Sequence, residues 1–117
     1  MPQQDLYIGL GSMAYALAKA DGRLQSEEVI LLQQILLEEP YGEIALSVVT
    51  LYDRYGVKPE EAYQFAFRRF ATHRRELDES MKKKFMGILQ HVAESFEGTS
   101  RKEQEILRRC RKELTRL

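Results

Sequence analysis

Carboxylate side chains gather at two glycine-containing corners of this sequence, and they are the residues best suited to chemistry. Hard cations such as calcium and magnesium are bound in proteins by carboxylate and other oxygen atoms. If the two corners lie side by side, their acids can converge on one divalent cation, which would be calcium, magnesium or manganese. The predicted ligands are Asp21, Glu27, Glu28, Glu97 and Glu103.

The first corner is not a calcium-binding loop of the EF-hand type. When Asp21 and Gly22 are set on loop positions five and six, the ligand positions one and three fall on Leu17 and Lys19. Neither side chain can coordinate calcium. A cation at this corner would therefore need carboxylates from the other corner as well.

The same residues also have a purely structural interpretation. Gly22 can end a helix in the left-handed conformation, and Asp21 suits a turn. Glu27 and Glu28 fall in a first helical turn, where the helix dipole favours each acid by roughly 0.3–1 kcal/mol. The residues alone leave both interpretations open.

Helical periodicity accounts for nearly the whole chain. Apolar residues recur at three- and four-residue spacing in segments that are separated by glycine, proline or capping residues. No run alternates with period two, so the predicted fold class is all-α. We expect a compact bundle of about six to seven helices in a single domain, residues 1–117. The predicted helices cover approximately 5–20, 26–38, 40–55, 59–73, 78–97 and 100–117.

Three finer expectations concern how these helices pack. The helix over 26–38 is apolar nearly all round, which predicts that it forms the centre of the domain. Gly9 and Gly11 each weaken the first helix by roughly 1 kcal/mol relative to alanine, so they predict a neighbour that packs closely. The predicted buried face of the third helix is Ile44, Val48, Leu51, Tyr52 and Tyr55.

The two ends of the chain resemble each other. Sliding the sequence along itself until Gly22 falls on Gly98 keeps the apolar register and matches further residues. The matched pairs are Asp21 with Glu97, Glu27 with Glu103, Ile30 with Ile106 and Leu31 with Leu107. Each end would then be a helix, an acid-glycine corner and another helix, which predicts an internal pseudo-repeat.

The run Ala-Asp-Gly-Arg-Leu-Gln-Ser-Glu-Glu at 20–28 resembles the signature of the tellurite-resistance TerB-like family. It follows an alanine-rich helix and precedes a leucine-rich one, and the second corner is similar to the degenerate second copy often seen in that family. The second copy departs from the pattern, because Phe96-Glu97 stands in place of Ala-Asp and Gln104 falls opposite Glu28. This departure argues against a symmetric two-sided metal site.

The resemblance implies a compact helical domain with an internal pseudo-repeat and an acidic cluster that binds a divalent cation. It further implies a bacterial cytoplasmic setting and a link to stress or tellurite resistance that acts through protein partners. It does not imply an enzymatic activity.

Other kinds of chemistry find little support in the sequence. His73 and His91 lie far apart, with no cysteine or histidine at ligand spacing, so zinc is not expected. Cys110 is the only cysteine and lies on the predicted inner stripe of its helix, where we expect a buried structural thiol. Phosphate-binding loops, nucleophile elbows and metalloprotease motifs are absent from the sequence. We therefore expect no catalytic residues.

The charge is balanced overall but unevenly spread. The chain holds 18 basic and 18 acidic residues, and the basic excess falls in the second half, 59–117. Acids interrupt its basic groups, so a solvated face is expected rather than a nucleic-acid interface.

The longest apolar stretch, 6–18, is too short to span a bilayer, and the start lacks the basic region of a secretory signal. A soluble cytoplasmic protein is the simplest expectation.

Two functions from different classes remain. The leading one is a non-enzymatic, TerB-like domain of a stress or tellurite-resistance response, with a divalent-cation site at the two acidic corners. The alternative is a metal-independent module that docks a protein partner along its basic C-terminal half or its exposed tyrosines. Dependence on a metal ion separates the two.

Overall fold

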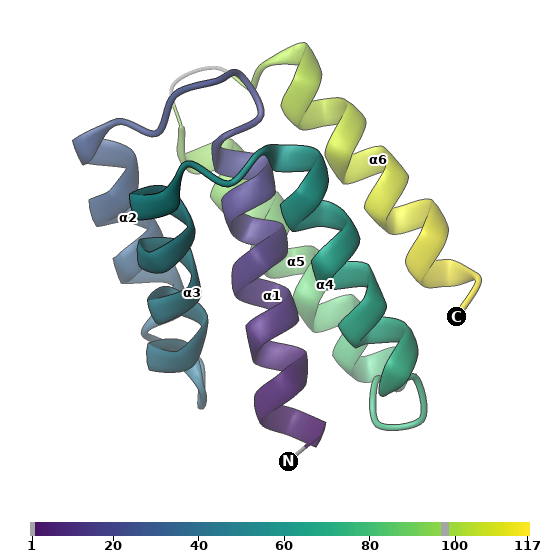
Figure 1. The fold of residues 1–117 in the computed structure, drawn as a ribbon. Helices are drawn as coiled ribbons and strands as arrows, with labels where there is room; N and C mark the ends of the chain where they lie inside the picture. Colours follow the sequence, from purple (N-terminus) through teal and green to yellow (C-terminus); the bar gives the residue numbers. More distant parts are fainter. Residues whose placement is uncertain (1, 97–98) are drawn as a thin grey trace.

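The computed structural model describes residues 2–96 and 99–117. Over these residues the chain forms six α-helices and no β-strand, which confirms the all-α class and the approximate helix number. Figure 1 shows them as one bundle, and only short connections separate consecutive helices. The helices are α1 (Pro2–Ala18), α2 (Ser26–Leu36), α3 (Gly42–Tyr55), α4 (Pro59–Thr72), α5 (Glu79–Ser95) and α6 (Arg101–Thr115).

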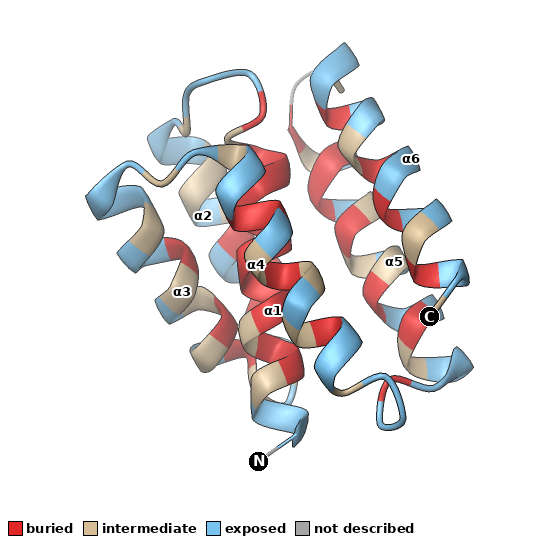
Figure 2. Ribbon diagram, turned by 45° about the vertical axis from the view of Figure 1, so that its right-hand side comes forward, coloured by how far each residue is buried: buried red, intermediate tan, exposed pale blue. Residues whose placement is uncertain are grey.

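The centre of the bundle is α1, not α2. This helix packs against α3, α4, α5 and α6, and every residue from Gly9 to Ala18 is buried. Figure 2 shows α1 buried along most of its length beyond its exposed first turn, while the other helices keep an exposed face. The prediction that the helix over 26–38 forms the centre is therefore wrong.

The physical reason lies in side-chain size. The buried part of α1 is rich in glycine, alanine and serine, which let several neighbouring helices approach its backbone at once. A Cβ atom on Gly11 would lie 2.9 Å from the Cα atom of Ala45 in α3, and closer still to its carbonyl oxygen. A Cβ atom on Gly9 would lie 2.7 Å from the Phe70 ring of α4. The close packing that the two glycines predicted is confirmed.

In contrast, α2 lies at the edge of the bundle. It packs against α3 and α5, and it buries only Leu32, Ile35 and Leu36. Ile30 and Leu37 keep 53% and 51% of their surface exposed. The large apolar side chains of α2 make this segment strongly hydrophobic in sequence. The same large side chains keep neighbouring helices at a distance from its backbone, so α2 cannot be surrounded by other helices as α1 is.

The buried face of α3 also differs from the prediction. Ala45 and Val49 turn towards α1, whereas Leu51 and Tyr55 are exposed. The remaining members of the predicted face, Ile44, Val48 and Tyr52, are partly buried. Close contact with Gly11 requires a small residue on the facing helix, so α3 is rotated to place Ala45 there, and this rotation moves Leu51 outward.

Several helix ends follow the local rules of capping. The Asp78 carboxylate accepts a hydrogen bond of 2.9 Å from the Met81 amide at the start of α5. Gly56, with a φ of 63°, ends α3 in the left-handed conformation. Pro59 occupies the first turn of α4, where its missing amide hydrogen costs nothing.

Other ends depart from the predicted positions by one or two residues. A serine that precedes two acids favours Ser26 as the N-cap of α2, but the structure has Gln25 as the N-cap. Helix α1 ends at Ala18, and Gly22, with a φ of 98°, lies in the turn that follows. Helix α3 begins at Gly42, so Pro40 precedes it rather than opening it.

Within residues 2–96 and 99–117, no helix is both long enough and apolar enough to cross a bilayer.

The contact between α1 and α3 yields a stability prediction. Gly11→Ala should destabilise the fold by roughly 1–3 kcal/mol, because the added methyl group overlaps the Ala45 backbone. Urea denaturation followed by circular dichroism measures the change.

A matched control lies in α5. A Cβ atom on Gly87 would meet nothing within 4 Å, so Gly87→Ala should stabilise the protein by about 0.5–1 kcal/mol through helix propensity alone. Equal effects of the two substitutions would contradict the proposed close approach of α1 and α3.

Candidate functional site

The acidic residues of the two corners lie at one end of the bundle. Asp21 belongs to the connection between α1 and α2, Glu27 and Glu28 to the first turn of α2, and Glu103 to the first turn of α6. Figure 1 shows this connection and the start of α6 at the same end of the molecule. Glu97 and Gly98 lie outside the described residues.

Glu28 and Glu103 hold equivalent positions, because each is the third residue of its helix. One oxygen of Glu28 accepts a hydrogen bond of 2.8 Å from the Gln25 amide, which precedes α2. In the same way, one oxygen of Glu103 accepts a bond of 3.0 Å from the Ser100 amide, and the Ser100 hydroxyl accepts one of 3.1 Å from the Glu103 amide. A serine followed three residues later by a glutamate predicts a capping box at the start of a helix, and Ser100 and Glu103 form one in the structure.

This equivalence differs by one residue from the predicted repeat, which matched Glu27 with Glu103. The first corner is one residue longer between its glycine and its N-cap than the second, so the helix starts match Glu28 with Glu103. The pseudo-repeat as a whole stays a prediction, because its second corner is outside the described residues.

The carboxylate of Glu28 lies in a negative environment. Its pKa is raised above the ordinary value, first by partial burial and then by the negative charges of Asp21, Glu103 and Glu27. The hydrogen bond from the Gln25 amide acts in the opposite direction and lowers the pKa. Negative charges from the connection before α2 and from the start of α6 therefore both act on Glu28, although these two segments are far apart in the sequence.

Glu103 is the most deeply buried of the corner acids that the structure describes. Its side chain is almost inaccessible, with 3% of the residue exposed. One carboxylate oxygen is held in the capping box, and the other, Oε2, is buried without a hydrogen-bond partner among the described residues. Burying a polar oxygen without a partner is costly, and more so when it carries charge.

The described residues do not form a complete metal site. Asp21 and Glu27 are exposed, and no group of three histidine, cysteine, aspartate or glutamate side chains within 2–96 and 99–117 is arranged to hold a metal ion. The starts of α2 and α6, which carry Glu28 and Glu103, lie at the same end of the bundle, and Asp21 belongs to the connection before α2. The position of Glu97 relative to them lies outside the described residues.

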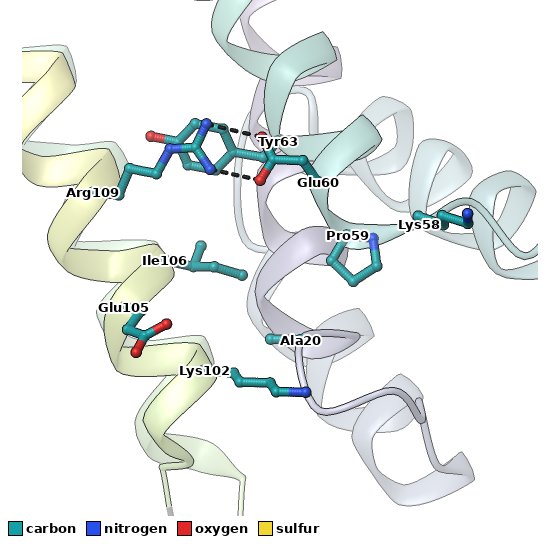
Figure 3. A pocket seen from close by; sticks show the side chains of 9 residues that line it. All are labelled: Ala20, Lys58, Pro59, Glu60, Tyr63, Lys102, Glu105, Ile106 and Arg109. Carbon is teal, nitrogen blue, oxygen red and sulfur yellow. Dashed lines mark hydrogen bonds and ion pairs between the residues drawn. The ribbon is translucent and has the colours of Figure 1, made fainter.

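A second candidate is a cavity of about 500 Å³ between the end of α1, the start of α4 and one side of α6. Figure 3 shows Ile106 pointing into this space and Ala20 and Pro59 forming its apolar wall. The charged residues that line it are all exposed, namely Lys58, Glu60, Lys102, Glu105 and Arg109. A ligand would thus meet apolar walls, the buried Tyr63 and exposed charged side chains.

The most constrained group beside this cavity is the Arg109 guanidinium. It forms a two-pronged ion pair with Glu60, with distances of 2.6 and 2.9 Å, and its carbon lies 3.8 Å from the centre of the Tyr63 ring. Tyr63 in turn donates a hydrogen bond to Glu113. The pair with Arg109 lowers the pKa of Glu60, while burial and the bond to Glu113 raise that of Tyr63. These contacts join α6 to α4.

Sequence reasoning missed this network. Arg109 and Glu60 are far apart in the chain, and the sequence carries no signal that α6 returns beside α4. From the sequence, Arg109 belongs to the basic residues that are expected to face solvent. Only its ion pair with Glu113, four residues later on the same helix, could have been predicted from spacing.

Other basic residues of the C-terminal half are also held in ion pairs. Arg69 lies 3.3 Å from Asp5, and Lys84 lies 2.9 Å from Glu39. His73 also contacts the Asp5 carboxylate, at 2.9 Å, and this contact is the largest cause of the lowered pKa of Asp5. Acids therefore accompany these basic groups in space as well as in sequence, in keeping with the expected solvated face.

Cys110 is buried, as predicted. Only 1% of its surface is exposed, and burial raises the pKa of its thiol to about 12. Because the thiolate is the reactive form, this cysteine is chemically inert near neutral pH while the fold is closed.

Comparisons of this chain with known proteins found no match. The chain matches no protein-family model, no curated protein and no solved structure.

The environment of Glu28 predicts a pH effect. A carboxyl group whose pKa is raised by folding holds its proton more tightly in the folded state, so the fold loses stability as the pH rises from about 4.5 through the raised value. Glu28→Gln keeps an oxygen for the Gln25 amide and removes the charge, so it should raise the urea midpoint at pH 7 and leave it unchanged near pH 3.5.

Glu27→Gln is the control, because Glu27 is exposed and holds no capping bond. It should change the midpoint little at either pH. A gain from Glu28→Gln that is the same at both pH values would show that charge repulsion is not its cause.

The Arg109 network predicts a second stability effect. Arg109→Lys removes the two-pronged pair with Glu60 and the flat contact with Tyr63, and should cost about 1–2 kcal/mol. Arg108→Lys, on the exposed side of the same helix, should cost almost nothing. Thermal denaturation compares the two variants, and equal stability would mean that Arg109 does not anchor α6.

Proposed function

We propose that this chain is a non-enzymatic, TerB-like helical domain that binds a divalent cation where α2 and α6 begin. The observation that carries the proposal is the buried Oε2 atom of Glu103, which has no hydrogen-bond partner among the described residues. A bound cation would supply the missing partner and offset the cost of burying this charged oxygen.

Glu28 supports the same location. Its carboxylate is repelled by the charges of Asp21, Glu103 and Glu27, and a cation placed among these groups would turn repulsion into attraction. One oxygen of each capping-box glutamate is already engaged with backbone, so each retains one oxygen for a ligand. The site would therefore draw one oxygen from α2 and one from α6.

The ligand chemistry favours a hard cation. All the acids concerned offer oxygen atoms, which suits calcium, magnesium or manganese rather than a metal that prefers sulfur or nitrogen. Calcium takes six to eight oxygen ligands and magnesium six. Glu28 and Glu103 would form the inner pair, Asp21, Glu27 and Glu97 would add charge or ligands, and water would complete the shell.

Such a cation would join two helices that are distant in the sequence. It would fix the start of α2 relative to the start of α6 and so shape the surface at this end of the bundle. We propose that this surface is the one offered to protein partners in a bacterial stress or tellurite-resistance response in the cytoplasm. The support is the resemblance of residues 20–28 to the TerB-like signature, together with the all-helical fold.

The second candidate is an interaction module that needs no metal. It is favoured by the large apolar side chains left on the surface, above all Tyr55, which is 72% exposed. On this view, the acids at the two corners act only as helix caps.

Calorimetric titration with calcium, magnesium and manganese tests the cation site. We expect saturable binding by the unaltered protein, and at least a tenfold loss of affinity in Glu103→Gln, which keeps the capping bond but loses the buried charge. Asp21→Ala should weaken binding less, because Asp21 is exposed.

Glu105→Gln provides the matched control, since Glu105 is an exposed acid on the same helix that lines the cavity beside α4. It should bind as the unaltered protein does. Heats no greater than dilution for all three cations would exclude the site and leave the metal-independent module. Equal losses in Glu103→Gln and Glu105→Gln would point to unspecific charge attraction.

A further inference from the structure

The outer side of α3 carries a stripe of side chains that no other helix covers. Figure 2 shows exposed and partly exposed residues along this side, opposite the buried residues Ala45 and Val49. The stripe lines a surface hollow of about 430 Å³ that involves α3 alone. Its members recur at helical spacing and are Glu43, Leu46, Ser47, Thr50, Leu51 and Arg54.

The order of these residues is self-complementary. Glu43 and Arg54 lie at equal distances from the midpoint between Val48 and Val49, and they carry opposite charges. The same midpoint relates the small residues Ser47 and Thr50, and the leucines Leu46 and Leu51. Residues that match in this way come level with each other when two copies of a helix pack antiparallel about a two-fold axis.

We propose that a second copy of this chain docks on the outer side of α3, in an antiparallel, two-fold symmetric helix pair. Glu43 of each copy then lies beside Arg54 of the other, so the dimer holds two equivalent ion pairs, one at each end. Neither side chain forms an ion pair with another described residue within its own chain. A heterologous partner would have no reason to match this symmetry.

The middle of the stripe is suited to close contact. The Ser47 hydroxyl donates to the Glu43 carbonyl at 2.8 Å, and the Thr50 hydroxyl donates to the Leu46 carbonyl at 3.1 Å. The donor hydrogen of each hydroxyl is therefore satisfied within α3 and needs no partner across an interface. Their small size lets the two helix axes approach, and the leucines then cover both sides of the contact.

The leucines supply the apolar driving force. Leu51 is 50% exposed, and Leu46 is partly exposed. Covering both in each copy removes apolar surface from water, which favours association by roughly 25 cal/mol for each Å². The rotation of α3 that places Ala45 against α1 is what leaves Leu51 available for this contact.

The size of the surface sets the strength of the dimer. Helix α3 has 14 residues and is therefore about 21 Å long. A single helix pair of this length buries less than the roughly 1,200–2,000 Å² of a standard stable interface. The dimer should therefore be weak and depend on protein concentration.

Sedimentation equilibrium on the full chain tests the proposal at about 10 µM to 1 mM, the range suited to an interface of this size. We expect a monomer–dimer equilibrium for the unaltered protein. Glu43→Arg and Arg54→Glu should each weaken the dimer at least tenfold, because each places like charges together at both ends. An equimolar mixture of the two variants should associate again, because both ends then pair a cation with an anion.

A second pair of variants tests the apolar part. Leu51→Lys should abolish the dimer, whereas Ile30→Lys, at a similarly exposed position on α2, should leave it intact. Circular dichroism checks that all variants stay folded, as surface substitutions should. A monomer at every concentration would overturn the proposal, and so would a dimer that survives both charge reversals or a mixture that fails to associate.

Discussion

The close approach of α3 and α4 to the backbone of α1 is the constraint on which the rest of the bundle depends. Gly11 and Gly9 leave no room for a side chain at these two contacts. Because α1 is surrounded, α2 is displaced to the edge, and α3 must turn a small residue inward. The starts of α2 and α6, with their first-turn acids, then come to one end of the bundle. Packing at the centre thus decides which charged and apolar groups meet at the surface.

The connections and caps of the bundle could largely be read from the sequence, since each depends on a few neighbouring residues. Asp78, Ser100, Gly56 and Pro59 act where local rules place them. Which helix lies at the centre of the bundle could not be predicted from the sequence. Hydrophobicity patterns favour segments with large side chains, whereas a helix that is packed on every side needs small ones. The leucine-rich α2 was for this reason assigned a place that belongs to the glycine- and alanine-rich α1.

For the candidate site, sequence reasoning identified the acids but not their environments. Residue type and spacing indicate carboxylates at both corners, and the helices that carry Glu28 and Glu103 begin at the same end of the bundle. What the sequence lacks is burial: nothing in the chain distinguishes the hidden Glu103 from the exposed Glu27. The network of Arg109 with Glu60 was out of reach for a related reason, because it depends on which helices become neighbours. Local signals are short-range, and sites are made by long-range contacts.

Because the single thiol is buried, its reaction with a thiol reagent can report the movement of α6 away from the bundle. Cys110 lies on α6, the last helix, and its sulfur is sealed by the contacts that hold this helix to the bundle. A thiol reagent can reach that sulfur only in molecules whose α6 has moved away, so the rate of modification measures how often this happens. The cysteine has no partner to bond with inside the chain. It therefore records, without any added label, the frequency of the motion that would separate α6 from the rest of the bundle.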